Sequence, residues 1–208
     1  MDNPHGDQRT RFVVLASGTG TLLQSLLNAA ADPGFPAQIV AVGADVDDAM
    51  ALDRAAQVGV PTFVVPVSDY ATRSDWDQAL TSAIDQWNPD WIFCAGFMRI
   101  LGSATLTKYA GRIINTHPAL LPSFPGAHAV RDALGYGVRV TGCTMHLIDE
   151  GVDTGPIIAQ SPVHVDASDD ESSLHERIKM AERSLAVGTI AAIASRGCVV
   201  DGRRAYIP

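Results

Sequence analysis

Short apolar runs alternate with amphipathic segments through the first half of this 208-residue chain. The apolar runs occupy residues 12–16, 39–43, 62–65, 91–95 and 112–115. Runs of this length without a polar face are typical of strands that are covered on both sides. Strands that alternate with helices in this way form a parallel sheet with helices on both faces. We therefore expect an α/β fold with a doubly wound, mostly parallel, Rossmann-like sheet.

The remaining segments predict the helices and a different second half. We expect helices over residues 21–31, over 47–58 and around Trp76, Leu80, Ile84 and Trp87, which have helical spacing. Residues 117–126 hold three prolines and predict a loop. Residues 138–148 and 156–165 have the character of longer, paired strands. Ser168 and Glu171 have the spacing of a capping box before a last helix, and a hairpin is expected around Asp201 and Gly202.

The charge balance limits the class of partner. The chain has 15 basic and 23 acidic residues, which gives a net charge of −8. Such a balance argues against binding to nucleic acid or to an anionic membrane, but a few N–H groups and one cation suffice for a small anion. No apolar stretch is long enough to span a membrane. We expect small-molecule substrates, and the sequence leaves a monomer and a homodimer open.

The N-terminus and the cysteines bear on the compartment and on domain organisation. Residues 1–10 are polar and lack the apolar core of a secretory signal, so we expect a flexible tail followed by one domain over residues 11–208. Three widely spaced cysteines make neither a disulfide framework nor a metal-binding motif. A reducing, cytoplasmic location is the simplest interpretation. Cys94 and Cys143 lie within apolar strands and are interpreted as core residues.

Four segments are placed where a sheet of this type binds ligands. In open α/β sheets, ligands bind beside the carboxyl ends of the strands. Residues 17–21, 96–101, 115–126 and 149–155 follow the expected strands. The first segment is a glycine-rich turn that leads into a helix, and its free N–H groups suit a phosphate. Because Leu23 stands where a dinucleotide site has its third glycine, a turn that serves only packing remains an alternative.

The other segments carry candidate catalytic groups. Asn115 and His117 place an amide and an imidazole two residues apart, which suits stabilisation of an oxyanion and transfer of a proton. Asp153 lies in an acidic loop and would orient a histidine, although a solvated turn is the alternative. A zinc site from His117, His128 and His146 matches no metal motif, and no Gly-x-Ser-x-Gly motif is present. The residues predict an enzyme that binds a phosphate and performs acyl-type chemistry.

Two longer runs resemble a known family. INTHPALLPSFPG at residues 114–126, followed by GVRVTGCTMHLIDEGVDTGPIIAQ at 137–160, is similar to the folate-dependent formyltransferases. ASGTGTLLQSLL at 16–27 and AGFMRIL at 95–101 are similar to the branch that formylates glycinamide ribonucleotide in purine synthesis. The resemblance extends from about residue 12 to the C-terminus. It implies a ribonucleotide-binding N-terminal half and a folate-binding, catalytic C-terminal half.

The resemblance also implies a reaction and a set of residues. The formyl group of the co-substrate 10-formyltetrahydrofolate would pass directly to the amine, through a tetrahedral intermediate and without a metal. By their motifs, Asn115, His117 and Asp153 would be catalytic. The ribonucleotide would be bound by Gly20, Thr21, Leu22, Lys179 and Glu182. The folate would be bound by Arg73, Met98, Arg99, Ile100, Leu101, Asn115, His128, His146 and Asp149.

One departure and three alternatives accompany the resemblance. The family usually has Ser-Asn where this chain has Thr21 and Leu22, so an Asn contact to phosphate would be lost while backbone contacts remain. Formyltetrahydrofolate hydrolase shares the Asn/His/Asp set, but it usually carries an N-terminal regulatory domain for which a strand near residue 12 leaves no room. Methionyl-tRNA formyltransferase usually adds a C-terminal barrel and a basic surface. A non-catalytic protein that binds sugar phosphate or folate is the third alternative.

Overall fold

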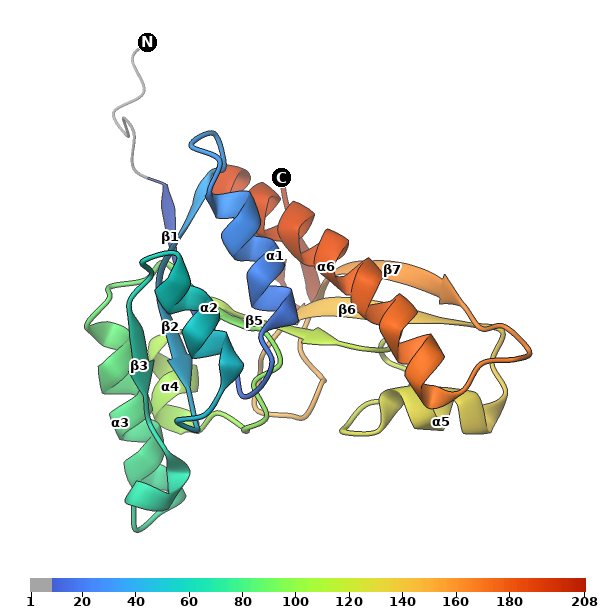
Figure 1. Cartoon of the computed structure of the whole chain (residues 1–208), viewed down its shortest axis with the longest axis horizontal. Coiled ribbons are helices and arrows are strands. Elements are labelled where there is room, and N and C mark those ends of the chain that lie inside the picture. The colour runs from blue at the N-terminus through green and yellow to red at the C-terminus, as the bar shows by residue number, and fades with distance from the viewer. Residues whose placement is uncertain (1–8) are drawn as a thin grey trace.

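A single nine-stranded sheet organises residues 9–208, which are the residues that the computed structural model describes (Figure 1). Its strands are β1 (Thr10–Leu15), β2 (Ala37–Ala44), β3 (Thr62–Val64), β4 (Trp91–Cys94), β5 (Ile113–His117), β6 (Val140–Leu147), β7 (Ile157–His164), β8 (Val199–Asp201) and β9 (Arg204–Tyr206). The strand order is β3-β2-β1-β4-β5-β6-β7-β9-β8. The first five strands are parallel, β6 is antiparallel to β5 and β7, and β8 and β9 form a hairpin. The predicted fold class is confirmed.

Helices cover the sheet on both faces. They are α1 (Thr21–Ala30), α2 (Met50–Gln57), the 3-10 turn η1 (Val67–Asp69), α3 (Arg73–Asp85), α4 (Ser103–Lys108), α5 (Ala129–Tyr136) and α6 (Glu171–Arg196). Helices α1 and α6 lie side by side across the front of the molecule in Figure 1. None of the helices among the described residues is long and apolar enough to cross a membrane. The short helices α4 and α5 were absent from the sequence prediction.

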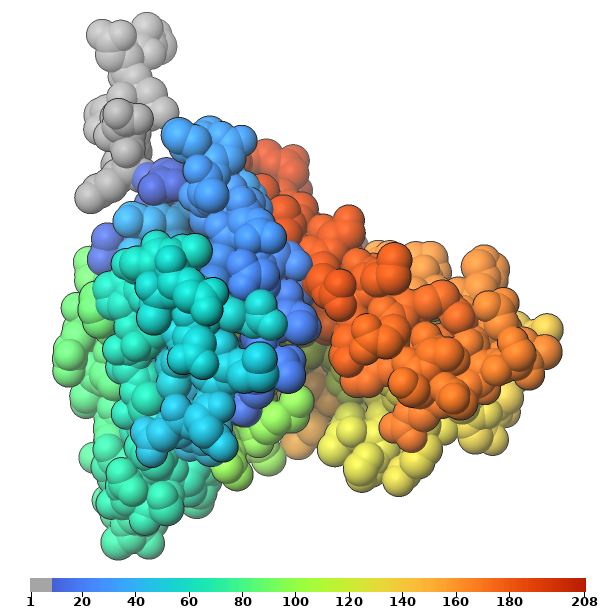
Figure 2. Space-filling view, viewed as in Figure 1, coloured from blue at the N-terminus to red at the C-terminus, as the bar shows by residue number. Residues whose placement is uncertain are grey.

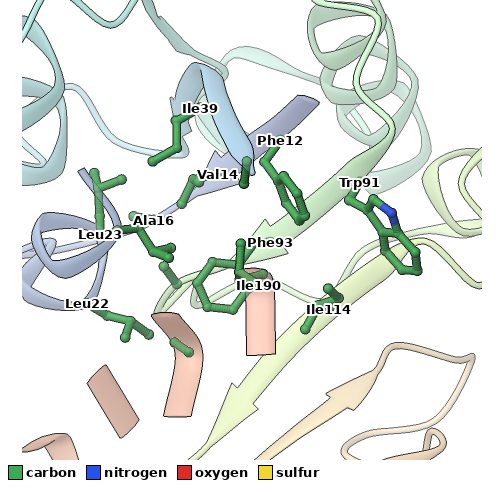
Figure 3. Close-up of a cluster of buried hydrophobic side chains, with 14 of the residues drawn as sticks. Phe12, Val14, Ala16, Leu22, Leu23, Ile39, Trp91, Phe93, Ile114 and Ile190 are labelled. Atoms are coloured by element: carbon green, nitrogen blue, oxygen red, sulfur yellow. The ribbon is translucent and has the colours of Figure 1, made fainter. Parts of the chain in front are cut away.

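The central strands contain continuous apolar runs because each contributes to two separate cores. Phe12 and Val14 of β1 pack with α1 and α6, together with Ile190 of α6 (Figure 3). Val13 and Leu15 face the opposite side and pack with α3. Successive side chains of a strand point to opposite faces, so a strand between two helical layers has no position for a polar residue. The continuous apolar runs in the sequence follow from this arrangement.

The strand order reverses between β1 and β4, and this is where the ligand-binding crevice of such a sheet opens. The loop after β1 and the segment after β4 meet there. The Ser17 N–H donates to the Gly96 carbonyl at 3.1 Å. The Met98 N–H donates to Ser17 Oγ at 2.8 Å. The two segments are therefore held together by the backbone and the side chain of Ser17.

Two details at the chain ends differ from the sequence prediction. The last helix begins at Glu171 with Asp170 as its N-cap, and Ser173 completes the capping box, so the prediction of Ser168 with Glu171 was wrong. Asp170 satisfies the N–H of Ser173 directly, which fixes the start two residues later. At the other end, residues 1–8 of the expected tail lie outside the described residues. Thr10 already pairs with Ala37 in the sheet.

Asp77 links α3 to the start of α4. Its buried carboxylate accepts hydrogen bonds from the N–H groups of Gly102, Ala104 and Thr105 and from the Thr105 hydroxyl. The first N–H groups of a helix have no partner within the helix, and α4 has no side-chain cap of its own. Asp77 supplies that cap from a neighbouring helix. A β-carbon at Gly102 would lie 2.6 Å from the Asp77 carboxyl, so the position requires glycine.

Asp77→Asn is expected to destabilise the fold by about 1–3 kcal/mol, because the amide replaces one acceptor by a donor opposite buried N–H groups. Urea denaturation of the purified protein measures this as a lower midpoint with an unchanged slope. The matched control is Asp85→Asn on the same helix, whose carboxylate forms an exposed ion pair with Lys108 and should change the midpoint little. Equal effects of the two substitutions would contradict the capping role.

Candidate active site

The loop after β1 presents free N–H groups at the start of α1. Gly20 adopts a left-handed conformation with φ of 66°, and a β-carbon there would lie 2.8 Å from the Ala51 Cα. Only glycine satisfies both requirements. No side chain caps α1. The N–H groups of Thr21 and Leu22, in its first turn, therefore have no intrahelical acceptor, and the helix dipole favours an anion beside them.

A cavity of about 270 Å³ lies between this loop and α6, and we call it the α1–α6 cavity. It is lined by residues 17–22, by the ends of β4 and β5, and by side chains of α6. The α6 residues are His175, Lys179 and Glu182. The ribonucleotide-binding residues expected from the sequence, Gly20, Thr21, Leu22, Lys179 and Glu182, all line this one cavity. Figure 2 shows the outline of the molecule indented below the start of α1, between the cyan and yellow elements.

A second, more open hollow of about 720 Å³ lies on the other side of Met98, and we call it the α3–α4 groove. It is lined by the expected folate residues Arg73, Met98, Arg99, Ile100 and Leu101. The Met98 and Ile100 side chains are 76% and 70% exposed. Exposed apolar side chains beside a groove mark a binding surface for an apolar or aromatic group.

Hydrogen bonds from other elements hold this segment in place. Arg73 Nη2 donates to the Ile100 carbonyl at 2.6 Å, and its guanidinium lies over the Trp76 ring. Arg99 Nε donates to the buried Asp45 carboxylate at 2.5 Å. Ser17 binds the N–H of Met98, and Asp77 binds the N–H of Gly102. Hydrogen bonds therefore hold residues 98–102 at several points without a ligand.

His117, at the end of β5, is buried and held through both ring nitrogens. Its Nε2 lies 2.7 Å from the Phe124 carbonyl, and because a carbonyl only accepts, Nε2 carries a proton. Its Nδ1 lies 3.3 Å from Asp153 Oδ2. A protonated ring can therefore donate to both neighbours. The Gly126 N–H donates to the same Asp153 oxygen at 2.8 Å, which ties the two loops around His117 together.

Asn115 and His146 form a second contact beside His117. His146 Nδ1 lies 2.9 Å from the Leu147 carbonyl, so Nδ1 carries the proton and Nε2 is free to accept. Asn115 Nδ2 donates to that Nε2 at 3.2 Å. Burial lowers the pKa of His146, and the Leu147 carbonyl and Asp153 oppose this in part. A neutral His146 thus orients the Asn115 amide and leaves its second N–H for a ligand.

Local contacts stabilise the conformation of the loop that carries Asp153. The Asp149 carboxylate accepts from the Gly151 N–H at 3.0 Å and from the Thr154 hydroxyl at 2.6 Å. Gly155 packs against the Leu147 carbonyl so closely that a β-carbon would overlap it. Asp153 itself has φ of 55°, an unusual value for a residue other than glycine. The resemblance places Asp149 at the folate, whereas in the structure its carboxylate stabilises the loop.

Glu182 is a half-buried residue at the end of the cavity next to β5. Burial raises the pKa of Glu182, and a hydrogen bond from Thr116 and the nearby His117 and Lys179 oppose the shift in part. Lys179 Nζ forms an ion pair with Glu176 at 2.7 Å on the outer side of α6. The cavity therefore combines the Glu182 carboxyl beside β5 with the basic side chains of Lys179 and His175 farther along α6.

The structure brings most of the expected residues into three adjoining sets. Asn115, His117 and Asp153 form the central cluster, and Met98 separates the cavity from the groove. His128 stands apart from this cluster: it is the exposed N-cap of α5. Within residues 9–208, no three His, Cys, Asp or Glu side chains form a group suited to a metal ion, so the zinc set weighed from the sequence is not assembled.

Several groups at the site were missed by the sequence prediction. Asp45 follows β2 directly, so the rule that ligands gather at the carboxyl ends of strands would have found it. Ser17 was inside the glycine-rich turn but was not assigned a role. The Phe124 carbonyl and the Gly126 N–H are backbone groups, which leave no signal in residue type. His175 belongs to no recognised motif. It lies at the site because helix α6 also includes the residues that precede Lys179.

Comparison with known proteins gives a consistent result. The family model described as "Formyl transferase" matches residues 10–190. Phosphoribosylglycinamide formyltransferase of Mycobacterium tuberculosis is 55% identical over 195 residues, which are 94% of this chain and 90% of the relative. The human trifunctional purine biosynthetic protein adenosine-3 is 39% identical over 90% of this chain and 19% of its own length. Glycinamide ribonucleotide transformylase 1 from Symbiobacterium toebii superimposes with a TM-score of 0.94 at 38% identity, covering 99% of this chain and 98% of that one.

The electrostatics of the cluster predict the titration of His146. Its pKa should lie below the ordinary 6.5 because of burial. Asp153→Asn should lower it further, because the substitution removes a negative charge that favours the protonated ring. NMR titration of the imidazole nitrogens measures both values. A midpoint that rises in Asp153→Asn would contradict the arrangement.

Proposed function

The chain belongs to the formyl transferase family and is an enzyme of formyl transfer in purine biosynthesis, and we propose that its acceptor is the primary amine of glycinamide ribonucleotide (GAR) and its donor is 10-formyltetrahydrofolate. One observation carries the proposal. Asn115, His117 and Asp153 lie in one cluster next to a cavity suited to a phosphate and a groove suited to a flat ring. In it, His117 Nδ1 lies 3.3 Å from Asp153 Oδ2, and Asn115 donates to His146. The two ligands would meet at this cluster.

GAR fits the α1–α6 cavity through its charges. The N–H groups at the start of α1 and the ammonium of Lys179 would bind the phosphate. The Glu182 carboxylate, near His117, would receive the amine end. This orientation directs the amine toward the central cluster.

The donor fits the α3–α4 groove through its aromatic ring. The ring would lie against the exposed side chains of Met98 and Ile100, and the backbone of residues 98–101 would bind its polar edge. Arg73 lines the same groove and suits a carboxylate of the folate tail. The formyl group would then project past Met98 toward Asn115 and His117.

The chemistry is a direct acyl transfer. The amine nitrogen of GAR attacks the formyl carbon, a C–N bond forms, and the carbonyl oxygen takes negative charge. The free N–H of Asn115 would donate to that oxygen, and the positive charge of a protonated His117 would stabilise it, while Asp153 holds the His117 ring. The bond from the formyl carbon to N10 of the folate then breaks, and the proton that the amine loses would be delivered to N10 by way of Asp153 and His117.

A formyl-transfer assay tests the proposal. Release of tetrahydrofolate should require both 10-formyltetrahydrofolate and GAR. Asn115→Ala and Asp153→Asn should each lower kcat by about 10²–10³, the usual cost of losing an oxyanion donor or its support. Asn28→Ala, an exposed residue of α1, is the matched control and should be fully active.

Other results of the same assay would support the alternative functions. Release of tetrahydrofolate without GAR would identify a formyltetrahydrofolate hydrolase. Folded protein that binds both ligands without turnover would identify a binding protein. Full activity of Asn115→Ala would remove the cluster from the chemistry.

Glu182 predicts an acid limb in the pH profile. Because burial raises its pKa, the carboxylate is lost at a higher pH than an ordinary glutamate, and the value of kcat/KM for GAR should fall as the pH decreases through that pKa. Glu182→Gln should have a raised KM for GAR at neutral pH. The pH profile of Glu182→Gln should contain only the titration of the GAR amine. Dividing the wild-type profile by the variant profile should therefore leave the titration of Glu182. Superimposable profiles would contradict the role.

A further inference from the structure

Helix α6 presents three side chains to the α1–α6 cavity, and only two belong to the set expected from the sequence. His175, Lys179 and Glu182 all line the cavity. Their spacing of four and then three residues places them along one stripe of the helix. At a rise of about 1.5 Å per residue, His175 lies about 6 Å from Lys179 and about 10 Å from Glu182 along the axis. His175 therefore lies at the end of the cavity farthest from Glu182.

The opposite wall offers the cavity no charged group. It consists of residues 17–22, in which Leu22 contributes an apolar, buried side chain and the first turn of α1 contributes N–H groups. A doubly charged phosphate is bound more tightly where cations supplement N–H donors. In this cavity the cations can come only from the α6 stripe, because among its described lining residues only His175 and Lys179 are basic.

His175 is available for such a contact. Its ring is half-buried and makes no hydrogen bond within residues 9–208. Lys179, in contrast, is already paired with Glu176. Burial and the neighbouring Lys179 lower the pKa of His175, and Glu176 and Glu171 oppose this. An anion between His175 and Lys179 would remove the repulsion between them.

We propose that His175 binds the phosphate of the acceptor together with Lys179 and sets the preference of the enzyme for a phosphorylated acceptor. This inference rests on the proposed function for the identity of the acceptor. The phosphate would lie between the N–H groups of Thr21 and Leu22 on one side and the two α6 side chains on the other. Glu182, about 10 Å away along the helix, would receive the amine of the same molecule.

The test compares His175→Gln with the wild type on two acceptors. With GAR, the KM should rise about tenfold while kcat and the KM for the folate stay unchanged, because one charge-assisted hydrogen bond to phosphate is lost. With the dephosphorylated nucleoside of GAR, the two proteins should have the same kcat/KM. His164→Gln is the matched control, since His164 is exposed at the end of β7 and should leave all values unchanged.

A binding measurement separates this inference from the proposed function. Calorimetry with ribose 5-phosphate does not depend on turnover, and His175→Gln should weaken its binding about tenfold. An unchanged affinity for ribose 5-phosphate would overturn the inference even in an active enzyme. An equal loss with both acceptors would also overturn it, because a structural effect does not distinguish the phosphate. An inactive wild type whose ribose 5-phosphate binding depends on His175 would refute the proposed acceptor and support the phosphate contact.

Discussion

Two hydrogen bonds made by Ser17 connect the loop after β1 to the segment after β4, and the positions of the cavity and the groove depend on this connection. One joins its N–H to Gly96 and the other joins its hydroxyl to the N–H of Met98. They lie where the strand order reverses between β1 and β4, so the two loops diverge and leave a crevice. Because Ser17 lines the cavity and binds the N–H of Met98, which lines both hollows, the two hollows have a fixed separation. A transfer reaction between two bound molecules requires such a separation.

The central cluster is built from backbone as much as from side chains. Phe124 and Asp153 both have positive φ values, which cost free energy in residues other than glycine. The distortion places the Phe124 carbonyl at one nitrogen of His117 and the Asp153 carboxylate at the other. The Gly126 N–H then links both loops. The ring is thus oriented before a substrate binds, so the enzyme need not order it in the transition state.

The sequence predicts those features that depend on local pattern. Apolar runs predict β1 and β4 because a strand between two helical layers has no polar position. Asn115 and His117 were identified because side-chain chemistry appears in the sequence. Helix α4 was missed because its cap, Asp77, is supplied from another helix, and the start of α6 was misplaced because Ser168 and Asp170 both have suitable side chains. Only the three-dimensional contacts of Asp170 with Ser173 distinguish them.

The net charge of −8 does not conflict with anionic ligands. At physiological ionic strength charges beyond about 8 Å are largely screened, so a bound phosphate responds to the groups that touch it. In the binding mode that we propose for the α1–α6 cavity, these groups are the N–H groups of α1 and the basic residues of α6, while Glu182 lies at the other end. A rigid helix fixes the distance between the two ends. In this proposed binding mode, a ligand that carries an anion and an amine at a different separation would satisfy only one of them, so the spacing of these residues along α6 would contribute to the choice of acceptor.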